Sequence, residues 1–180
     1  MTLDPDTEIG NGQRAAMGSA NRLKLGLFGA NCSAGRAVTT VPERWSGSWP
    51  DCVRLAQMAD RAGIEFMLPI GRWKGYGGDT DYQGASWETV SWACGLLAKT
   101  ERLTVFGTVH APLIPPLIAA KEFVTADHIG DGRFGLNLVC GWNGRVRDVR
   151  RDVARSRGTL RICTGMARYR QIGLVSARGF

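Results

Sequence analysis

One stretch decides the fold: Gly132-Arg133-Phe134-Gly135-Leu136-Asn137-Leu138-Val139-Cys140-Gly141-Trp142-Asn143. A Gly-Asp-Gly turn leads into the apolar run from Phe134 to Cys140, and a turn followed by such a run predicts a buried strand. The polar residue Asn137 interrupts this run, and a buried amide costs stability unless it is hydrogen-bonded. Asn137 is therefore either a structural residue tied to a neighbouring strand or a ligand contact at a strand end.

Three apolar runs upstream of this stretch predict further strands, at residues 23–30, 64–70 and 102–110. Helical patterns separate the strands: one at residues 48–62, one that Ser86 caps, and one that Pro115 and Pro116 start and Gly130 ends. Nearly continuous apolar strands are typical of a parallel sheet covered by helices. Both an open doubly wound sheet and a (β/α)8 barrel fit this α/β order, and both place ligands at the carboxyl ends of the strands.

The apolar spacing within each helical segment predicts which residues face the sheet. Trp87 and Trp92 are expected to serve packing rather than chemistry. The predicted inner faces consist of Leu55, Met58, Ala59 and Ala62 in the first helix, Val90, Ala93, Cys94 and Leu97 in the second, and Leu117, Ala120 and Val124 in the third.

Unusual residues follow the predicted strands at their carboxyl ends. The loop at residues 71–78, Gly-Arg-Trp-Lys-Gly-Tyr-Gly-Gly, is either a solvated turn or a phosphate or flavin contact, because Arg and Lys supply donors and Gly lets the backbone approach closely. Thr108 and His110 end the third strand, where His110 is either a satisfied structural group or a catalytic base. The long polar loop at residues 31–47 is a further functional candidate.

The composition is that of a globular protein. Hydrophobic residues make up 44% of the 180, and no apolar run reaches about 18 residues, so no membrane span is expected. Five cysteines without a C-x-x-C pair suggest reduced thiols and a cytoplasmic location. The two histidines, His110 and His128, are not spaced as a metal pair, so no metal site is expected. Residues 1–21 are polar and Gly-rich without periodicity, which predicts a disordered leader.

The charge is distributed unevenly along the chain. Residues 144–180 hold 10 Arg and 2 Asp, a balance of +8, whereas the whole chain is +7 and residues 1–143 are therefore −1. A basic tail of this kind is one signature of a nucleic-acid-binding module. A surface that stacks bases would interleave aromatic residues, however, and this tail has only Tyr169 and Phe180. We therefore expect no nucleic-acid partner.

The opening stretch resembles a strand of the luciferase-like, flavin-dependent monooxygenases, in the branch that contains alkanesulfonate, dimethylsulfone and pyrimidine monooxygenases. Members of that branch carry a Gly-Gly-Arg-Phe-Gly-x-Asn-x-Val-x-Gly-Trp pattern, matched here except that Asp131 replaces the first Gly. The resemblance also covers the Gly-Tyr-Gly-Gly loop at residues 75–78 and the Thr-Val-His-Ala-Pro-Leu-Ile-x-Pro segment from Thr108. It implies that residues 22–143 form about four βα units, the N-terminal half of a luciferase-like TIM (β/α)8 barrel.

The resemblance also implies a reaction and a set of site residues. The reaction is oxygen insertion into a small sulfonate, sulfone or pyrimidine by reduced FMN (FMNH2) and O2. A separate reductase that uses NAD(P)H would deliver the flavin, and the intact family member would form a homo-oligomer. Thr108 and Asn137 would lie beside the flavin ring, with Gly71 as a backbone contact and Arg72 where the pyrimidine branch has a Lys. His110 is the remaining catalytic candidate.

After Asn143 the resemblance ends, and residues 144–180 become Arg-rich and aperiodic. We expect this tail to be out of frame, disordered and not native to the fold. Reading one nucleotide onward from the codon of Gly144 permits A-E-F-E-M-F-G-V-T-L-P-D-H-E-E-R-Y-A-Y-A-Q-E-W, which resembles the family's continuation. The final Trp of this string is forced, because the ATG of Met166 followed by the G of Ala167 gives TGG.

A half-barrel cannot close its sheet, so the truncated chain is expected to have little or no activity. Two alternatives concern the same barrel: a catalytically silent luciferase-like subunit, and an enzyme that uses coenzyme F420 in place of FMN.

Overall fold

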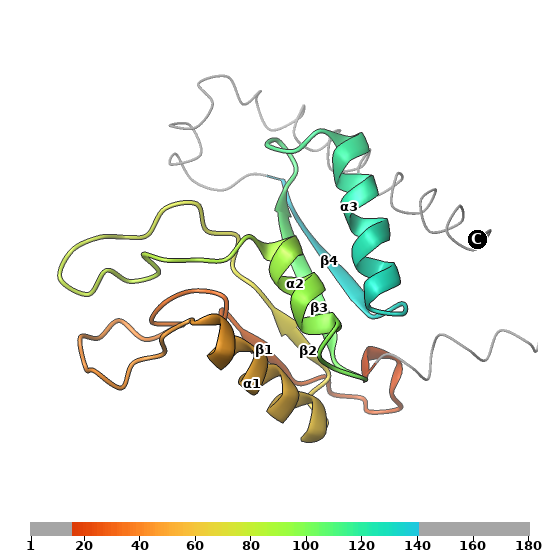
Figure 1. Ribbon diagram of the computed structural model, residues 1–180, viewed down its shortest axis with the longest axis horizontal. Coiled ribbons are helices and arrows are strands. Elements are labelled where there is room, and N and C mark those ends of the chain that lie inside the picture. Colours follow the sequence, from red (N-terminus) through yellow and green to blue (C-terminus); the bar gives the residue numbers. More distant parts are fainter. Residues whose placement is uncertain (1–15, 141–180) are drawn as a thin grey trace, which may run out of the picture.

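The computed structural model describes residues 16–140, in which four strands alternate with three helices (Figure 1). The predicted order of strands and helices is confirmed, although the first two strands are shorter than expected. The elements are a 3-10 turn η2 (Ala16–Gly18), β1 (Gly26–Phe28), α1 (Trp49–Arg61), β2 (Phe66–Leu68), α2 (Thr89–Leu97), β3 (Thr104–His110), α3 (Pro116–Ile129) and β4 (Phe134–Val139).

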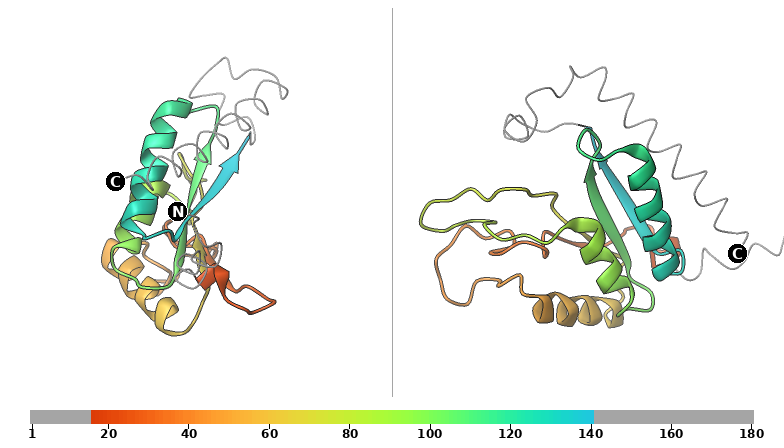
Figure 2. Two further views of the ribbon diagram at one scale, coloured as in Figure 1. Left: turned by 90° about the vertical axis from the view of Figure 1, so that its right-hand side faces the viewer. Right: turned by 45° about the horizontal axis from the view of Figure 1, so that its top comes forward.

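The four strands form one parallel sheet in the order β1-β2-β3-β4. The longest pairing joins β3 to β4 and sets Thr108 opposite Asn137. All three helices lie on the same face of the sheet, and no described helix covers the other face (Figure 2). Sequential parallel strands with helices on one side are consecutive βα units of a (β/α)8 barrel, because a doubly wound sheet carries helices on both faces.

The hydrophobic core lies between the sheet and the helices. Met67 from β2 and Val105 and Val109 from β3 point into it and are at most 2% exposed. Phe134 at the start of β4 stacks on Phe123 of α3, with ring centroids 6.0 Å apart. The helices contribute mostly small or aliphatic side chains, among them Cys52, Ala56, Ala59, Val90, Ala93, Leu96, Leu97, Ala119 and Ala126.

The other face of the sheet carries aromatic rings. Phe66 of β2 and Phe106 of β3 meet edge to face, with centroids 5.7 Å apart. Gly26 and Gly135 on the neighbouring strands lie against these rings, and a Cβ at either position would overlap them. Phe28 on β1 is 49% exposed. This is the face that points inward when such a sheet closes into a barrel.

The predicted inner faces of the helices are only partly correct. Met58 and Leu117, which were expected to face the sheet, are 53% and 71% exposed. The apolar pattern overweights these large side chains, whereas alanines allow a helix to lie closer to the sheet. The residues that are buried instead are Cys52, Ala56 and Ala59 in α1 and Ala119, Ala120, Phe123 and Ala126 in α3.

The predicted helix ends are correct for α3 but not for α2. Gly130 is the C-cap of α3, as expected. The N-cap of α2 is Glu88 rather than Ser86, and the Glu88 carboxylate accepts hydrogen bonds from two amides of the first turn. The Ser86 hydroxyl instead donates to the carbonyl of Arg72, so it is unavailable as a cap.

Residues 16–21 belong to the fold, which corrects the expectation of a disordered leader over residues 1–21. The amide of Ala16 donates to the carbonyl of Arg102, and Asn21 Nδ2 donates to the buried carboxylate of Glu65 at 2.7 Å. The earlier part of the expected leader, and the expected out-of-frame tail, lie outside the described residues.

The cysteines only partly match the expectation of reduced thiols. Cys32, Cys52 and Cys94 have free thiols, whereas Cys140 is disulfide-bonded. Within residues 16–140, no helix has both the length and the apolar character that crossing a membrane requires.

Candidate functional site

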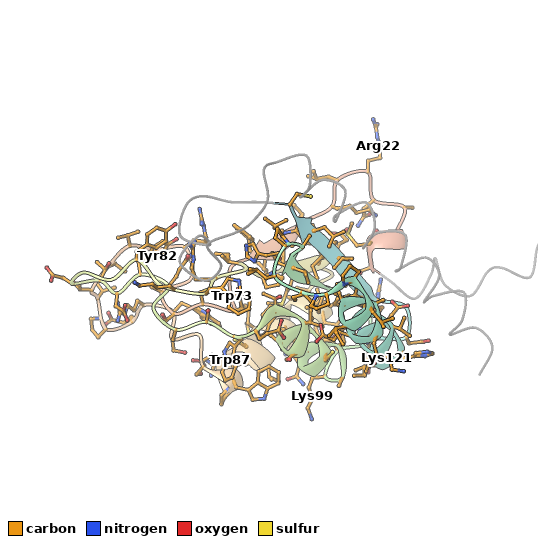
Figure 3. The ribbon with its side chains drawn as sticks, turned by 90° about the horizontal axis from the view of Figure 1, so that it is seen from above. Arg22, Trp73, Tyr82, Trp87, Lys99 and Lys121 are labelled. Carbon is orange, nitrogen blue, oxygen red and sulfur yellow. The ribbon has the colours of Figure 1, made fainter. Side chains whose placement is uncertain are left out.

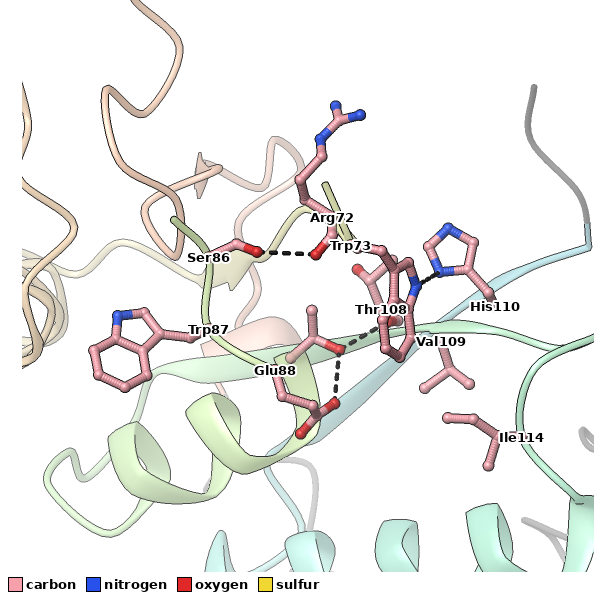
Figure 4. A pocket seen from close by; sticks show the side chains of 11 residues that line it. Arg72, Trp73, Ser86, Trp87, Glu88, Thr108, Val109, His110 and Ile114 are labelled. Atoms are coloured by element: carbon pink, nitrogen blue, oxygen red, sulfur yellow. Dashed lines mark hydrogen bonds between the residues drawn. The ribbon is translucent and has the colours of Figure 1, made fainter. Parts of the chain in front are cut away.

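A cavity of about 210 Å³ opens at the carboxyl ends of β2 and β3 (Figure 4). Three segments line it, one after β2, one at the start of α2 and one at the end of β3, because the carboxyl ends of parallel strands meet at one edge of the sheet. The lining residues are Gly71, Arg72, Trp73, Ser86, Trp87, Glu88, Thr89, Thr108, Val109, His110 and Ile114. The cavity therefore brings together four of the predicted site residues: Gly71, Arg72, Thr108 and His110.

Gly71 lies so close to two side chains of β3 that a side chain at this position would force them to shift. A Cβ there would lie 2.6 Å from His110 Cε1 and 3.0 Å from Thr108 Cγ2. The backbone after β2 consequently packs directly against the side chains at the end of β3. The close approach is to protein side chains, and the expected approach of this backbone to a phosphate or flavin remains a prediction.

Thr108 and Asn137 form one hydrogen-bonded pair across β3 and β4. The Thr108 hydroxyl donates to the carbonyl of Pro69 at 2.7 Å and accepts from Asn137 Nδ2 at 3.2 Å. The Thr89 hydroxyl donates to the carbonyl of Thr108 at 2.7 Å. Asn137 is thus tied to a neighbouring strand and does not line the cavity itself. Its contact with a ligand remains a prediction.

His110 is a buried imidazole whose acceptor nitrogen is occupied. Trp73 Nε1 donates to His110 Nδ1 at 3.2 Å, and an indole N–H can only donate. The ring proton of neutral His110 therefore lies on Nε2. Burial, with a contribution from the Arg72 guanidinium, lowers the pKa of His110 below its usual value. A neutral His110 can donate a hydrogen bond from Nε2, but it cannot act as a base at Nδ1 without losing the bond from Trp73.

Arg72 lines the cavity, but its guanidinium is engaged by other side chains of its own loop. Its guanidinium points away from Thr108 and His110 (Figure 4). It donates from Nε to Gln83 Oε1 at 3.0 Å, and its Cζ lies 4.6 Å from the centre of the Tyr76 ring. A contact between Arg72 and a flavin therefore remains a prediction.

The two long loops at residues 31–47 and 71–86 are joined to each other, and the sequence did not indicate this. Fully buried Asn31 donates to the carbonyl of Ile70 and accepts from its amide, at 2.9 and 2.8 Å. Fully buried Gln83 has a positive φ of 56° and donates to the carbonyl of Gly35. Figure 3 shows Tyr82 far out in this pair of loops, with Trp73 closer to the sheet. A buried polar residue within a long loop is the signal that could have identified Asn31 and Gln83.

Glu88 is the acidic residue of the cavity. Burial opposes its ionisation, but hydrogen bonds from the amides of Ser91 and Val90 outweigh burial and hold the pKa of the Glu88 carboxyl below its usual value. Glu88 is therefore an ionised helix cap rather than a proton donor. Residues 16–140 contain no group of three His, Cys, Asp or Glu side chains that could hold a metal ion.

The amino-terminal end of the sheet contains a buried cation. Arg133, just before β4, is 6% exposed. Its guanidinium donates to the carbonyls of Leu97, Thr100 and Leu103 at 2.9 Å each, at the carboxyl end of α2. Burial lowers the pKa of Arg133, yet a guanidinium remains charged in proteins. The arginine of the opening stretch is therefore structural.

Asp60 in α1 performs a matching role at the same end. Its Oδ1 accepts from the amides of Arg102 and Leu103 at 3.0 and 2.7 Å, and its Oδ2 accepts from the amide of Glu101 at 2.7 Å. One carboxylate thus pairs three consecutive backbone donors and fixes the loop that enters β3.

This fold and site define the class: a half-barrel of βα units with a cavity at the carboxyl ends of its strands. A model of the family "Luciferase-like monooxygenase" matches residues 23–176. The chain belongs to this family. The match continues beyond Asn143, where the resemblance was expected to end.

Named relatives and solved structures agree with this assignment. Over 120 residues the chain is 40% identical to the pyrimidine monooxygenase RutA of Pseudomonas syringae pv. syringae and 32% identical to that of Caulobacter vibrioides. These alignments cover 67% of this chain and 33% and 34% of the relatives. The chain thus spans about a third of the length of the curated relatives it matches.

Two solved structures share the fold. The monooxygenase RslO1 from Streptomyces bottropensis has a TM-score of 0.64 and 19% identity, over 81% of this chain and 42% of its own. The riboflavin lyase RcaE, solved with modified FMN and riboflavin, has a TM-score of 0.56 and 25% identity, over 66% of this chain and 30% of its own.

Proposed function

We propose that this chain carries the amino-terminal part of an FMN-dependent monooxygenase, in which reduced FMN and O2 insert an oxygen atom into a small organic substrate. One observation carries the proposal: the cavity at the carboxyl ends of β2 and β3, where Gly71, Thr108 and His110 meet. The names of the relatives support a monooxygenase, and the FMN in the RcaE structure supports the cofactor.

The residues present fit a flavin ring. Gly71 lines the cavity, and Val109 and Ile114 supply an apolar wall. A complete ligand pocket usually holds roughly 300–1,000 Å³. The cavity of about 210 Å³ is smaller, so we infer that residues beyond those described complete it.

We assign the roles at this site as follows. Bound reduced FMN would supply the oxygen chemistry. Gly71 would contact the ring with its backbone, and Thr108, oriented by Asn137, would lie beside the ring. His110 would donate a hydrogen bond from Nε2 to a carbonyl oxygen, rather than accept a proton as a base. Arg72 would reach the cofactor only after its guanidinium turned away from Gln83.

The substrate class remains a sulfonate, a sulfone or a pyrimidine, and the names of the relatives favour a pyrimidine. We further infer that a separate reductase, fed by NAD(P)H, supplies the reduced flavin in the cytoplasm, and that the intact protein is a homo-oligomer. The reductase would supply the flavin in the reduced form that the proposed reaction uses.

We also infer that residues 144–180 are out of frame and that the chain as written has little or no activity. Resequencing the gene around the codon of Asn143 tests this. A missing or extra nucleotide there would support the inference, and an unchanged frame would overturn it.

Flavin binding by the chain itself is tested by titration with photoreduced FMN under nitrogen. We expect saturable binding, weakened at least about fivefold by Thr108→Val, which removes the hydroxyl but keeps the shape. Thr125→Val is the matched control, because Thr125 is an exposed residue of α3 whose hydroxyl bonds only the preceding turn. Equal binding by all three proteins, or preference for coenzyme F420, would contradict the proposal.

A further inference from the structure

We propose that Trp73 selects the substrate of this site: its indole face receives a flat, uncharged heteroaromatic ring of the pyrimidine kind, and His110 is the positioning residue that holds the indole. This inference deepens the proposed function and rests on it, because a ring is selected for oxidation only where the oxidation occurs.

The Trp73 ring is largely exposed, yet its N–H is hydrogen-bonded to a buried residue, which is unusual for a surface side chain. Its side chain lines the cavity and is 60% exposed, although tryptophan is a large apolar residue. Its N–H is nevertheless bonded to His110 Nδ1, which belongs to a residue that is only 6% exposed. An exposed ring attached to a buried anchor presents its face in a fixed position.

The anchor itself has little freedom to move. The backbone of Gly71 also packs against the His110 ring, so close that a Cβ would be 2.6 Å from Cε1. His110 is thus restrained by contacts with both Gly71 and Trp73, and Figure 4 shows its hydrogen bond with Trp73. Because the indole is held in advance, a ligand that stacks on it loses little additional freedom to the protein.

The groups around the indole favour an uncharged ring. The Arg72 guanidinium points away from Thr108 and His110 and bonds Gln83, and the Glu88 carboxylate is engaged by the amides of α2. Neither charge is directed at the space beside Trp73. The Nε2–H of His110 suits a ring carbonyl oxygen, which a pyrimidine has. A sulfonate is tetrahedral, so it cannot stack on the indole face. Its negative charge is spread over three oxygens, and a single donor would satisfy it poorly.

Trp87 provides an internal comparison on the same cavity. It is also exposed, at 43%, but its Nε1 donates outward to the carbonyl of Gly47 at 2.7 Å. Its ring packs edge to face against Trp49, with centroids 6.1 Å apart. Figure 4 shows its indole directed away from Thr108 and His110. Trp87 is therefore a matched tryptophan that should not stack a ligand.

The test compares two rings with the same hydrogen-bonding groups. Uracil is flat and aromatic, and 5,6-dihydrouracil is puckered. Ligand-observed NMR titrations of the whole chain would measure the affinity ratio of the two. Because stacking on one aromatic residue is worth about 1–3 kcal/mol, wild type should prefer uracil at least about fivefold. Trp73→Leu should abolish the preference, whereas Trp73→Phe and Trp87→Leu should keep most of it.

His110→Asn tests the positioning role. Asn can place an acceptor near the position of Nδ1, so the preference for uracil should survive, whereas His110→Leu should reduce it as Trp73→Leu does. Circular dichroism of each variant checks the fold.

Absence of uracil binding by the wild type, or an unchanged preference in Trp73→Leu, would overturn the inference. An FMN titration of the same variants separates it from the proposed function. A loss of FMN affinity in Trp73→Leu equal to the loss for uracil would show that the indole contacts the flavin, and this too would overturn it. If uracil binding depends on Trp73 while wild type binds no FMN, the proposed function fails and the ring site stands.

Discussion

The two ends of the parallel sheet use polar residues in opposite ways. At the amino-terminal end, Arg133 and Asp60 direct their charges at backbone groups of neighbouring elements. At the carboxyl-terminal end, Thr108 and His110 surround a cavity of about 210 Å³. In barrels of this class the first end serves stability and the second serves chemistry. The difference shows that a charged residue beside a strand is no guide to function until the end of the strand is known.

The stretch around β4 contributes to both ends. Arg133 holds the carboxyl end of α2, Gly135 leaves room for the ring of Phe106, and Asn137 bonds the hydroxyl of Thr108. The stretch is therefore largely structural in this chain, and Asn137 is linked to the cavity through its hydrogen bond to Thr108.

The largest expected effect lies at the amino-terminal end. Arg133→Met should lower the free energy of unfolding by about 3 kcal/mol or more, because it leaves several buried carbonyls without donors. Urea denaturation followed by circular dichroism would measure this. Arg54→Met is the control, since Arg54 forms a surface ion pair with Asp51 and should cost less than about 1 kcal/mol. Equal losses in the two variants would remove the distinction between the two ends.

A smaller loss is expected when the close approach at the carboxyl-terminal end is disturbed. Gly71→Ala places a Cβ against His110 and should cost about 1–3 kcal/mol, as overpacking generally does. It should also weaken FMN binding. The double variant Gly71→Ala with His110→Ala removes the ring that the new Cβ meets, so at least half of the lost stability should return. No recovery in urea denaturation would mean that the His110 contact does not limit residue 71.

The carboxylate of Asp60 should contribute less to the free energy of unfolding than the guanidinium of Arg133. Asp60→Ala removes the acceptor of three backbone amides, two of which belong to exposed residues that water can reach. We expect a loss of about 1–2 kcal/mol, with Asp60→Asn between it and wild type because Asn keeps one acceptor oxygen. FMN affinity should be unchanged in both variants. A change in FMN affinity would link the two ends and contradict the comparison.

Much of the architecture could be predicted from the sequence, because apolar runs and helical spacing determine element order directly. The strand ends also brought Gly71, Thr108 and His110 together as expected. The failures have physical causes. Hydropathy assigned Leu117 to the core of α3, whereas small alanines occupy the contact. The hydrogen bond between Trp73 and His110 was not predicted. The two residues are 37 positions apart in the sequence, so this contact leaves no local pattern.

The smallest expected effect is a pH dependence of stability that arises from His110 and not from Arg133 or Asp60. Burial and the Arg72 guanidinium lower the pKa of His110 in the folded chain, so the unfolded chain binds the proton more readily. Stability from the neutral imidazole is therefore fully present above the unfolded pKa of about 6.5 and is lost as the pH falls toward the folded pKa. We expect the free energy of unfolding of wild type to fall relative to that of His110→Asn as the pH is lowered from about 7.5 to about 5.

The same protonation would turn Nδ1 into a donor and break its bond from Trp73. The preference for uracil over dihydrouracil should therefore fall with pH in wild type and stay constant in His110→Asn. Parallel pH profiles for the two proteins would show that His110 remains neutral throughout, or that it does not hold the indole. The stability profile distinguishes these two outcomes, because only a histidine that titrates on unfolding gives it a slope.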